Sequence, residues 1–416
     1  MIELILSEKL KELDSRAQDE LRGVFDSFEK ISYITSERVL EQFKKNRVSE
    51  SLFAGSTGYG YGDNGRDALD NIFAGAFEAE AAFARHNIVN GTQAISIALF
   101  GVLRPGDVLL SITGAPYDTL SEVIGNKTKN GDGSLADFGI DYDEVPLKDG
   151  DVDFETVKEK VSEYGNRVKM LYIQRSKGYE NRPTFSAEKI GEIVSFCHSI
   201  SDACVFVDNC YGEFCDEHEP TFYGADLMAG SLIKNPGGGI AKTGGYVAGK
   251  KKYVELASYR LTTVGIGLEC GATLDEKRDM YRGFFLAPHV VCQAKKTAAF
   301  ASFIFSALGF ETYPSYTEDR HDIIQSVILG SADKLCSFCQ GIQSSSPVDS
   351  FVKPEPWDMP GYADQVIMAA GTFISGASIE LSADGPLREP YIAYFQGGLT
   401  YESGRLAILS AAEKML

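Results

Sequence analysis

Hydrophobic side chains recur at helical spacing over the first part of the chain. Apolar positions in residues 6–46 follow this spacing without an internal proline, which predicts an N-terminal helical arm. A tyrosine- and glycine-rich loop follows, and residues 67–85 then carry a second helical pattern behind possible caps at Asp63 and Asn64. We therefore expect two helical segments before the first strand.

Short apolar runs alternate with amphipathic segments between residues 90 and 250. The runs DVLLSI, VKMLYI, CVFVD and GGYVAG predict strands, and the segments NGTQAISIALFGVL and SAEKIGEIVSFCHSI predict helices. Strands separated by helices and short loops favour a mostly parallel sheet that is covered on both faces. The predicted fold class is α/β.

The pattern changes after about Pro288. AKKTAAFASFIFSALGF predicts a helix, later runs such as QVIMAAGTFI and YIAYFQ predict strands among prolines, and SGRLAILSAAEKML predicts a closing helix. We expect a helical arm over residues 1–50, a large α/β domain over 51–288 and a smaller C-terminal α/β domain over 289–416, with part of the arm a candidate addition to it.

Composition removes several classes of protein. The chain has 416 residues and a formal charge of -19, which disfavours a nucleic-acid or anionic-membrane surface. Its longest apolar run, residues 298–310, is shorter than the roughly 20 residues that span a bilayer. The N-terminus lacks the basic-then-apolar order of a signal peptide, so we expect a soluble, cytoplasmic protein.

Cysteine and histidine spacing gives no metal-site signature. The eight cysteines do not form a disulfide scaffold in a chain of this length. Cys336 and Cys339 form a C-x-x-C without a second pair, and the five histidines show no i, i+4 pairing. We expect no metal cofactor.

An aspartate and a lysine carry the most specific chemistry. Asp208 closes the apolar run CVFV, and Lys234 follows in a segment of small residues and glycines, SLIKNPGGG. The aspartate can keep the pyridine nitrogen of pyridoxal phosphate protonated while the lysine binds the cofactor as a Schiff base. Ligands of open α/β sheets gather at the carboxyl ends of strands, which favours this over a turn-capping aspartate and a surface lysine.

Other residues supply the remaining parts of such a cofactor site. Gly91 and Thr92 begin a predicted helix whose backbone amides suit a phosphate, and Ser231 adds a hydroxyl three residues before the lysine. Tyr117 follows a strand end, where its ring can stack on a planar cofactor. The alternatives are an ordinary capped helix and a tyrosine packed in a turn.

The chain resembles a bacterial family over residue 30 to the C-terminus. The motifs GYGYGDNGR, NGTQAI, APYDTL, IQRSKGY, VDNCYGEF, GSLIKNPGGG, TGGY and REPYIAYFQGGLTYE occur in order. Together they resemble the aluminium-resistance or methionine gamma-lyase-like proteins, which are fold-type I pyridoxal-phosphate enzymes related to cystathionine and methionine lyases.

The resemblance implies roles for the residues already named. It implies Lys234 as the cofactor lysine, Asp208 as the partner of the pyridine nitrogen, and Gly91, Thr92 and Ser231 at the phosphate, with Tyr117 on the ring. It further implies that Tyr59 and Tyr61, with Arg66 nearby, reach the phosphate of a neighbouring subunit. A homodimer is then the smallest active unit, and a homotetramer is expected.

Three positions depart from the family pattern. Asn90 and Gln93 stand where serine and histidine are usual, so we include Gln93 among the cofactor-binding candidates on position alone. Lys242 stands where proline is more common, which makes it a minor rival to Lys234.

A substrate carboxylate needs a planar bidentate donor, which favours arginine. Arg388 is the first candidate and Arg175 the second, although both could be structural ion-pair residues. The leading hypothesis is a carbon–sulfur lyase that acts on a small sulfur-containing amino acid, with Lys234 as base and its pKa lowered by burial. Another pyridoxal-phosphate reaction (transamination, aldol cleavage or γ-replacement) and a metal-tolerance protein are the alternatives.

Overall fold

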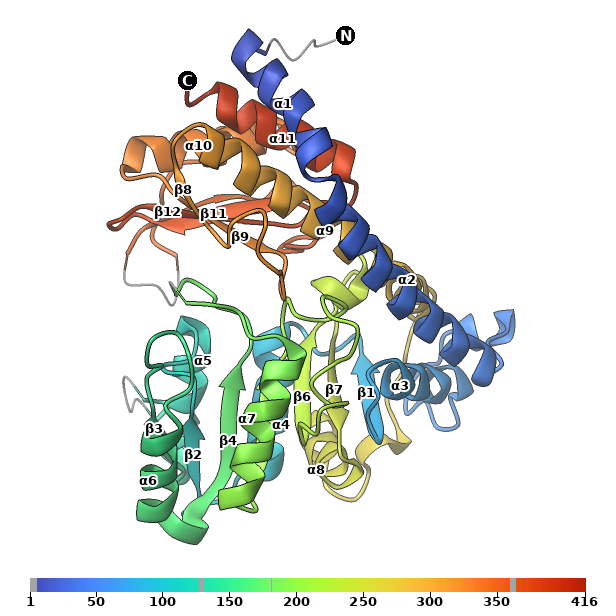
Figure 1. The fold of residues 1–416 in the computed structure, drawn as a ribbon. Coiled ribbons are helices and arrows are strands. Elements are labelled where there is room, and N and C mark those ends of the chain that lie inside the picture. The colour runs from blue at the N-terminus through green and yellow to red at the C-terminus, as the bar shows by residue number, and fades with distance from the viewer. Residues whose placement is uncertain (1–5, 127–130, 181, 360–363) are drawn as a thin grey trace.

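The computed structural model describes residues 6–126, 131–180, 182–359 and 364–416. It has two sheets, each with its own helices, and one long helix that runs between them (Figure 1). We call the seven-stranded sheet with its helices the large domain, and the five-stranded sheet with its helices the small domain. No helix in these ranges is long and apolar enough to cross a membrane.

The large domain contains a mostly parallel sheet in the order β1-β7-β6-β5-β4-β2-β3. The strands β2 to β6 are parallel to one another, and β7 is antiparallel to both β6 and β1. The strand bounds are β1 Ala81–Arg85, β2 Val108–Ser111, β3 Asp141–Glu144, β4 Val168–Gln174, β5 Cys204–Asp208, β6 Leu227–Ser231 and β7 Gly245–Gly249.

Helices cover both faces of this sheet. One face packs against α4 (Gly91–Val102), α5 (Asp118–Ile124) and α8 (Lys251–Leu261), and the other against α3 (Asn64–Ala76), α6 (Phe154–Tyr164) and α7 (Ala187–Ile200). Alternate residues of one strand serve the two cores: Val205 and Val207 point to the second face, and Cys204 and Phe206 to the first. A parallel sheet buried on both sides explains why its strands are apolar runs.

The small domain is an antiparallel sheet in the order β10-β11-β12-β9-β8. Its strands are β8 Glu311–Tyr313, β9 Ile324–Ile328, β10 Val366–Ala369, β11 Ser382–Pro386 and β12 Ile392–Gln396, and its helices are α10 (Ala332–Ser344) and α11 (Tyr401–Glu413). The domains are joined by α9 (Lys277–Ala307), so the boundary expected after residue 288 lies inside one continuous helix.

The N-terminal arm consists of two helices, α1 (Glu8–Glu20) and α2 (Arg22–Lys45), which lie along α9 and reach from the small domain to the large one (Figure 1). Leu10, Leu13 and Ala17 of α1 are buried in the core of the small domain. The first half of the arm therefore packs with the C-terminal half of the chain.

The helix expected over residues 67–85 is wrong in its second half. α3 ends at Ala76, and Ala81–Arg85 is the strand β1, which pairs with β7. The Asp70 side chain accepts hydrogen bonds from Ala84 N at 3.0 Å and Arg85 Nη2 at 2.8 Å, which ties the strand to α3. Alanine-rich AAFAR has helical propensity, but strand pairing and this buried ion pair override it.

Candidate active site

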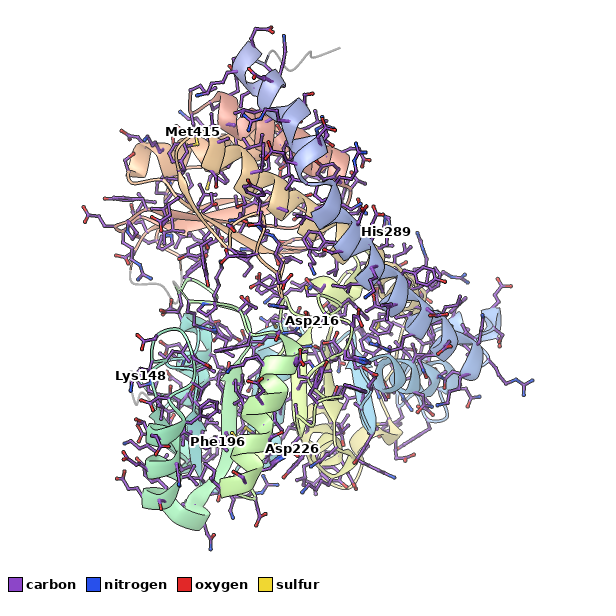
Figure 2. The ribbon with its side chains drawn as sticks, in the orientation of Figure 1. Lys148, Phe196, Asp216, Asp226, His289 and Met415 are labelled. Carbon is purple, nitrogen blue, oxygen red and sulfur yellow. The ribbon has the colours of Figure 1, made fainter. Side chains whose placement is uncertain are left out.

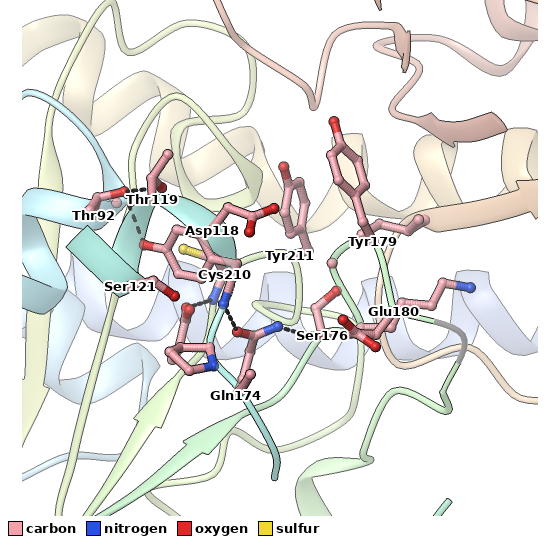
Figure 3. A pocket seen from close by; sticks show the side chains of 18 of the residues that line it. Thr92, Asp118, Thr119, Ser121, Gln174, Ser176, Tyr179, Glu180, Cys210 and Tyr211 are labelled. Carbon is pink, nitrogen blue, oxygen red and sulfur yellow. Dashed lines mark hydrogen bonds between the residues drawn. The ribbon is translucent and has the colours of Figure 1, made fainter. Parts of the chain in front are cut away.

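A cavity of about 770 Å³ lies at the carboxyl ends of the parallel strands, where the two domains meet. Large-domain residues at the ends of β4, β5 and β6 and at the start of α4 form most of its wall, and Figure 3 shows several of them. The small domain contributes Ile324, Asp384, Arg388 and Gln396. This is the position at which α/β folds bind ligands.

Asp208 is the last residue of β5, and its side chain faces the cavity. It is buried, and its carboxylate accepts hydrogen bonds from Cys210 N at 3.1 Å and from the Tyr172 hydroxyl at 3.3 Å. Burial raises the pKa of Asp208, and the nearby charge of Lys234 opposes this shift. A buried carboxyl beside a cationic amine suits the partner of a protonated pyridine nitrogen.

Lys234 lies in the turn after β6 and lines the same cavity. Its Nζ atom is 3.9 Å from the centroid of the Tyr211 ring. Burial alone would lower the pKa of Lys234, but Cys210, Tyr211 and Asp208 raise it well above its usual value. The expectation that burial lowers this pKa is wrong, because the amine is surrounded by groups that favour its charged form.

The first turn of α4 also faces the cavity, through Gly91 and Thr92. A Cβ atom at Gly91 would lie 3.0 Å from Cys210 Sγ and 3.4 Å from Ser231 Cβ, so a larger residue would require these side chains to shift by a few tenths of an ångström. Backbone amides at a helix start, the Thr92 hydroxyl and the buried Ser231 hydroxyl form a donor set that fits a phosphate.

Tyr117 precedes α5 and is held from two sides. Its hydroxyl donates to Thr92 Oγ1 at 3.0 Å, and its backbone N donates to Gln174 Oε1 at 2.9 Å (Figure 3). Burial raises the pKa of the Tyr117 hydroxyl, and the nearby Asp208 carboxylate raises it further, so the hydroxyl remains protonated. The ring therefore has a fixed place in the wall of the cavity beside Thr92 at the start of α4.

Four candidates for cofactor binding lie outside the cavity wall of this chain. The exposed Gln93 side chain accepts a hydrogen bond from Val89 N at 2.6 Å. It therefore contacts the backbone just before α4 instead of facing the cavity. Tyr59 and Tyr61 are exposed and stack with ring centroids 5.4 Å apart. Arg66 is buried beneath their loop and donates to Gly60 O at 2.8 Å.

The structure separates the two candidate arginines. Arg388 lines the cavity and is half-exposed. Arg175 is fully buried outside it and donates to Asp216 Oδ2 at 2.5 Å and Asn209 Oδ1 at 2.7 Å. Asp216 lies at the junction of the two domains (Figure 2). These contacts are those of a structural ion pair.

The rival lysine lies away from the cavity. Lys242 is more than half exposed and forms ion pairs with Glu276 at 3.3 Å and Asp279 at 3.0 Å. In the described ranges, no group of three or more His, Cys, Asp or Glu side chains could hold a metal ion.

Sequence reasoning missed several residues of the site. Tyr172 donates to Asp208, Gln174 orders the Tyr117 loop, and Tyr211 contacts Lys234. The role of Tyr172 could have been inferred from the sequence, since a tyrosine inside an apolar strand needs a hydrogen-bond partner for its hydroxyl. Asp384 comes from the small domain and accepts from the Tyr179 hydroxyl at 2.5 Å, a contact that no local pattern indicates.

Comparison with known proteins decides the family. The family model described as methionine gamma-lyase matches residues 10–416. The chain belongs to the methionine gamma-lyase family. As a family member it is a pyridoxal-phosphate-dependent carbon–sulfur lyase, which confirms the predicted cofactor, fold class and enzyme class.

Close relatives cover almost the whole chain. The uncharacterised protein YnbB of Bacillus subtilis (strain 168) is 53% identical over 98% of this chain and 97% of its own length. A solved carbon-sulfur lyase involved in aluminium resistance from Clostridium novyi NT is 49% identical, with a TM-score of 0.95 over 99% of this chain and 97% of that one. A solved Listeria monocytogenes protein, provisionally named a cystathionine beta-lyase involved in aluminium resistance, is 50% identical, with the same TM-score over 98% and 100%.

Proposed function

We propose that this enzyme eliminates a thiol from a sulfur-containing amino acid and releases a keto acid and ammonia. The observation that carries the proposal is the joint placement of Asp208, Lys234 and the start of α4 around one cavity. The names of its relatives support the substrate class. The overall reaction consumes one water, and the carbon–sulfur bond is the bond that breaks.

The cofactor stabilises charge on the substrate, and residues of the chain transfer the protons. Bound pyridoxal phosphate supplies an electron-poor ring that stabilises negative charge at the substrate Cα. Lys234 Nζ, once released as a neutral amine, accepts the Cα proton, and the raised pKa of Lys234 makes it a strong acceptor. The electron pair of the carbon–sulfur bond leaves with the sulfur, which then takes up a proton.

The other residues orient the reactants. Arg388 binds the substrate carboxylate in this proposal, which its position in the cavity wall supports. Asp208 favours a protonated pyridine nitrogen, and the Tyr117 ring restrains the cofactor plane. Gly91, Thr92 and Ser231 donate to the phosphate.

We also propose that a homodimer is the smallest active unit and that two dimers form a tetramer. Tyr59 and Tyr61 stack on each other near the buried Arg66, and their exposed fractions of 72% and 63% leave the pair available for contact with a second subunit. Tyr61→Ala should weaken both self-association in sedimentation and cofactor affinity.

All eight cysteines are free, which supports a reducing, cytoplasmic location.

The test is product analysis with L-methionine and L-cystathionine. The purified enzyme should release keto acid, ammonia and thiol in equal amounts from at least one of them, and Lys234→Ala should release none. Two-oxobutanoate without pyruvate from cystathionine would place the elimination at Cγ, and the reverse at Cβ. Keto acid without thiol would contradict the proposal.

A further inference from the structure

The amine of Lys234 rests on the face of an aromatic ring. Its Nζ atom is 3.9 Å from the Tyr211 centroid, well within the distance of about 6 Å at which a cation over a ring is stabilised. Both residues line the cavity. Among the described residues, no group forms a hydrogen bond or ion pair with this amine.

Tyr211 adopts a backbone conformation that is costly for a residue with a side chain. Its φ is +72°, in the left-handed region that favours glycine. Such strain persists only where surrounding contacts enforce it, and it occurs frequently at functional sites. The conformation therefore needs an explanation in the surroundings of Tyr211.

Three contacts hold Tyr211 in this position. Asn235, the residue after Lys234, donates from Nδ2 to Tyr211 O at 2.9 Å, and Cys215 Sγ donates to the same oxygen at 3.3 Å. From the small domain, Ser378 Oγ donates to the Tyr211 hydroxyl at 3.4 Å. The strained backbone is thus tied to the cofactor lysine, and the far end of the ring is tied to the other domain.

We propose that Tyr211 is a positioning residue whose ring face holds the free Lys234 amine beside the reacting atoms whenever that amine is not attached to the cofactor. The inference rests on the proposed role of Lys234. The face of the Tyr211 ring favours the charged form of the amine. The ring therefore keeps Lys234 in place after its amine has taken up a proton. It acts through Lys234 and makes no bond to the substrate.

Other groups also act on the charge of this amine. Asp208, Cys210 and Tyr117 favour the ammonium, and Glu213 interacts with it electrostatically from the turn behind. A test must therefore change the ring of Tyr211 and leave these groups intact. Tyr211→Phe keeps the aromatic face and loses the hydroxyl, whereas Tyr211→Leu loses the face.

The experiment measures covalent attachment of pyridoxal phosphate to the full-length, cofactor-free enzyme by visible absorbance across a pH series. The attachment rate follows the neutral fraction of the Lys234 amine. Loss of the ring face in Tyr211→Leu should move the rate–pH profile down by about one pH unit, which makes attachment about tenfold faster below the plateau. Tyr211→Phe and Ser378→Ala should follow the wild-type profile.

The outcomes separate this inference from the proposed function. A wild-type rate–pH profile in Tyr211→Leu would contradict the positioning role of Tyr211, and so would an equal shift of the profile in Tyr211→Phe. Neither result would affect the proposed role of Lys234. Cofactor attachment to Lys234→Ala would instead remove the proposed function. If Tyr211→Leu does not fold, Tyr211→Trp should move the profile upward, because an indole ring binds cations more strongly, and an unmoved profile would overturn the inference.

Discussion

Replacement of Arg175 by methionine separates a structural arginine from a substrate-binding one. The Arg175 guanidinium is fully buried and donates to Asp216 and Asn209, with Glu219 at 3.5 Å. The variant leaves the buried Glu219 and the partly buried Asp216 without their cation, although His321 still contacts Asp216 at 2.7 Å. Removal of one partner from a buried ion pair costs about 3–5 kcal/mol of unfolding free energy.

Arg388→Met is the matched control, because Arg388 lines the cavity and forms an exposed ion pair with Asp364 at 3.4 Å. Its loss should change the unfolding free energy by less than about 1 kcal/mol. It should raise KM for the amino acid about tenfold to a hundredfold, because charged hydrogen bonds to the carboxylate are lost.

Urea denaturation and steady-state kinetics of both variants, with cofactor at saturation, provide the assay. We expect a large loss of stability with near-normal KM for Arg175→Met and the opposite for Arg388→Met. A stable Arg175→Met enzyme with a strongly raised KM would refute the reasoning and make Arg175 the carboxylate ligand.

Three further predictions concern the cofactor site and the loop beside it. Gly91→Ala should weaken pyridoxal phosphate binding about tenfold through overpacking against Cys210, and adding Cys210→Ala should restore most of the affinity in equilibrium dialysis; no restoration would contradict the steric cause. Burial alone would raise the pKa of Asp63, but its ion pair with Lys277 holds that pKa below its usual range, so its stabilising effect is present at neutral pH and is lost as pH falls below about 4. Urea midpoints should therefore show Lys277→Met less stable than wild type at neutral pH, with the difference shrinking in acid, whereas a constant difference would exclude this linkage. Tyr172→Phe, which removes a donor to the carboxylate beneath the cofactor, should lower kcat about three- to tenfold with little change in KM or stability, and an unchanged kcat would remove this role.

Local patterns in the sequence predicted the parts of the fold in which one segment determines its own structure. The strand CVFVD and the helix that begins at Gly91 appear as expected, because apolar runs and helix caps are local signals. β1 and β6 were missed, since AAFAR and LMAGS become strands only through pairing: β7 lies between them, and β6 also pairs with β5. Strand pairing over long sequence separations leaves no local signature.

The same distinction applies to the site. Asp208 was predicted because it closes a buried strand, and Lys234 because it follows among small residues and glycines; both line the cavity. The surroundings of Lys234 were not predictable, since its charge depends on Tyr211 and Cys210, whose positions are set by a strained turn. Asp384 was missed because the small domain brings it to the cavity from far along the chain.

The central claim is that pyridoxal phosphate is bound covalently to Lys234. The most direct measurement is the visible absorbance of the purified protein after addition of pyridoxal phosphate, compared with Lys234→Ala and Lys242→Ala. We expect wild type and Lys242→Ala to show the band of the lysine-bound cofactor and Lys234→Ala to lack it. A band that persists in Lys234→Ala, or a wild-type protein that never develops one, would contradict the account.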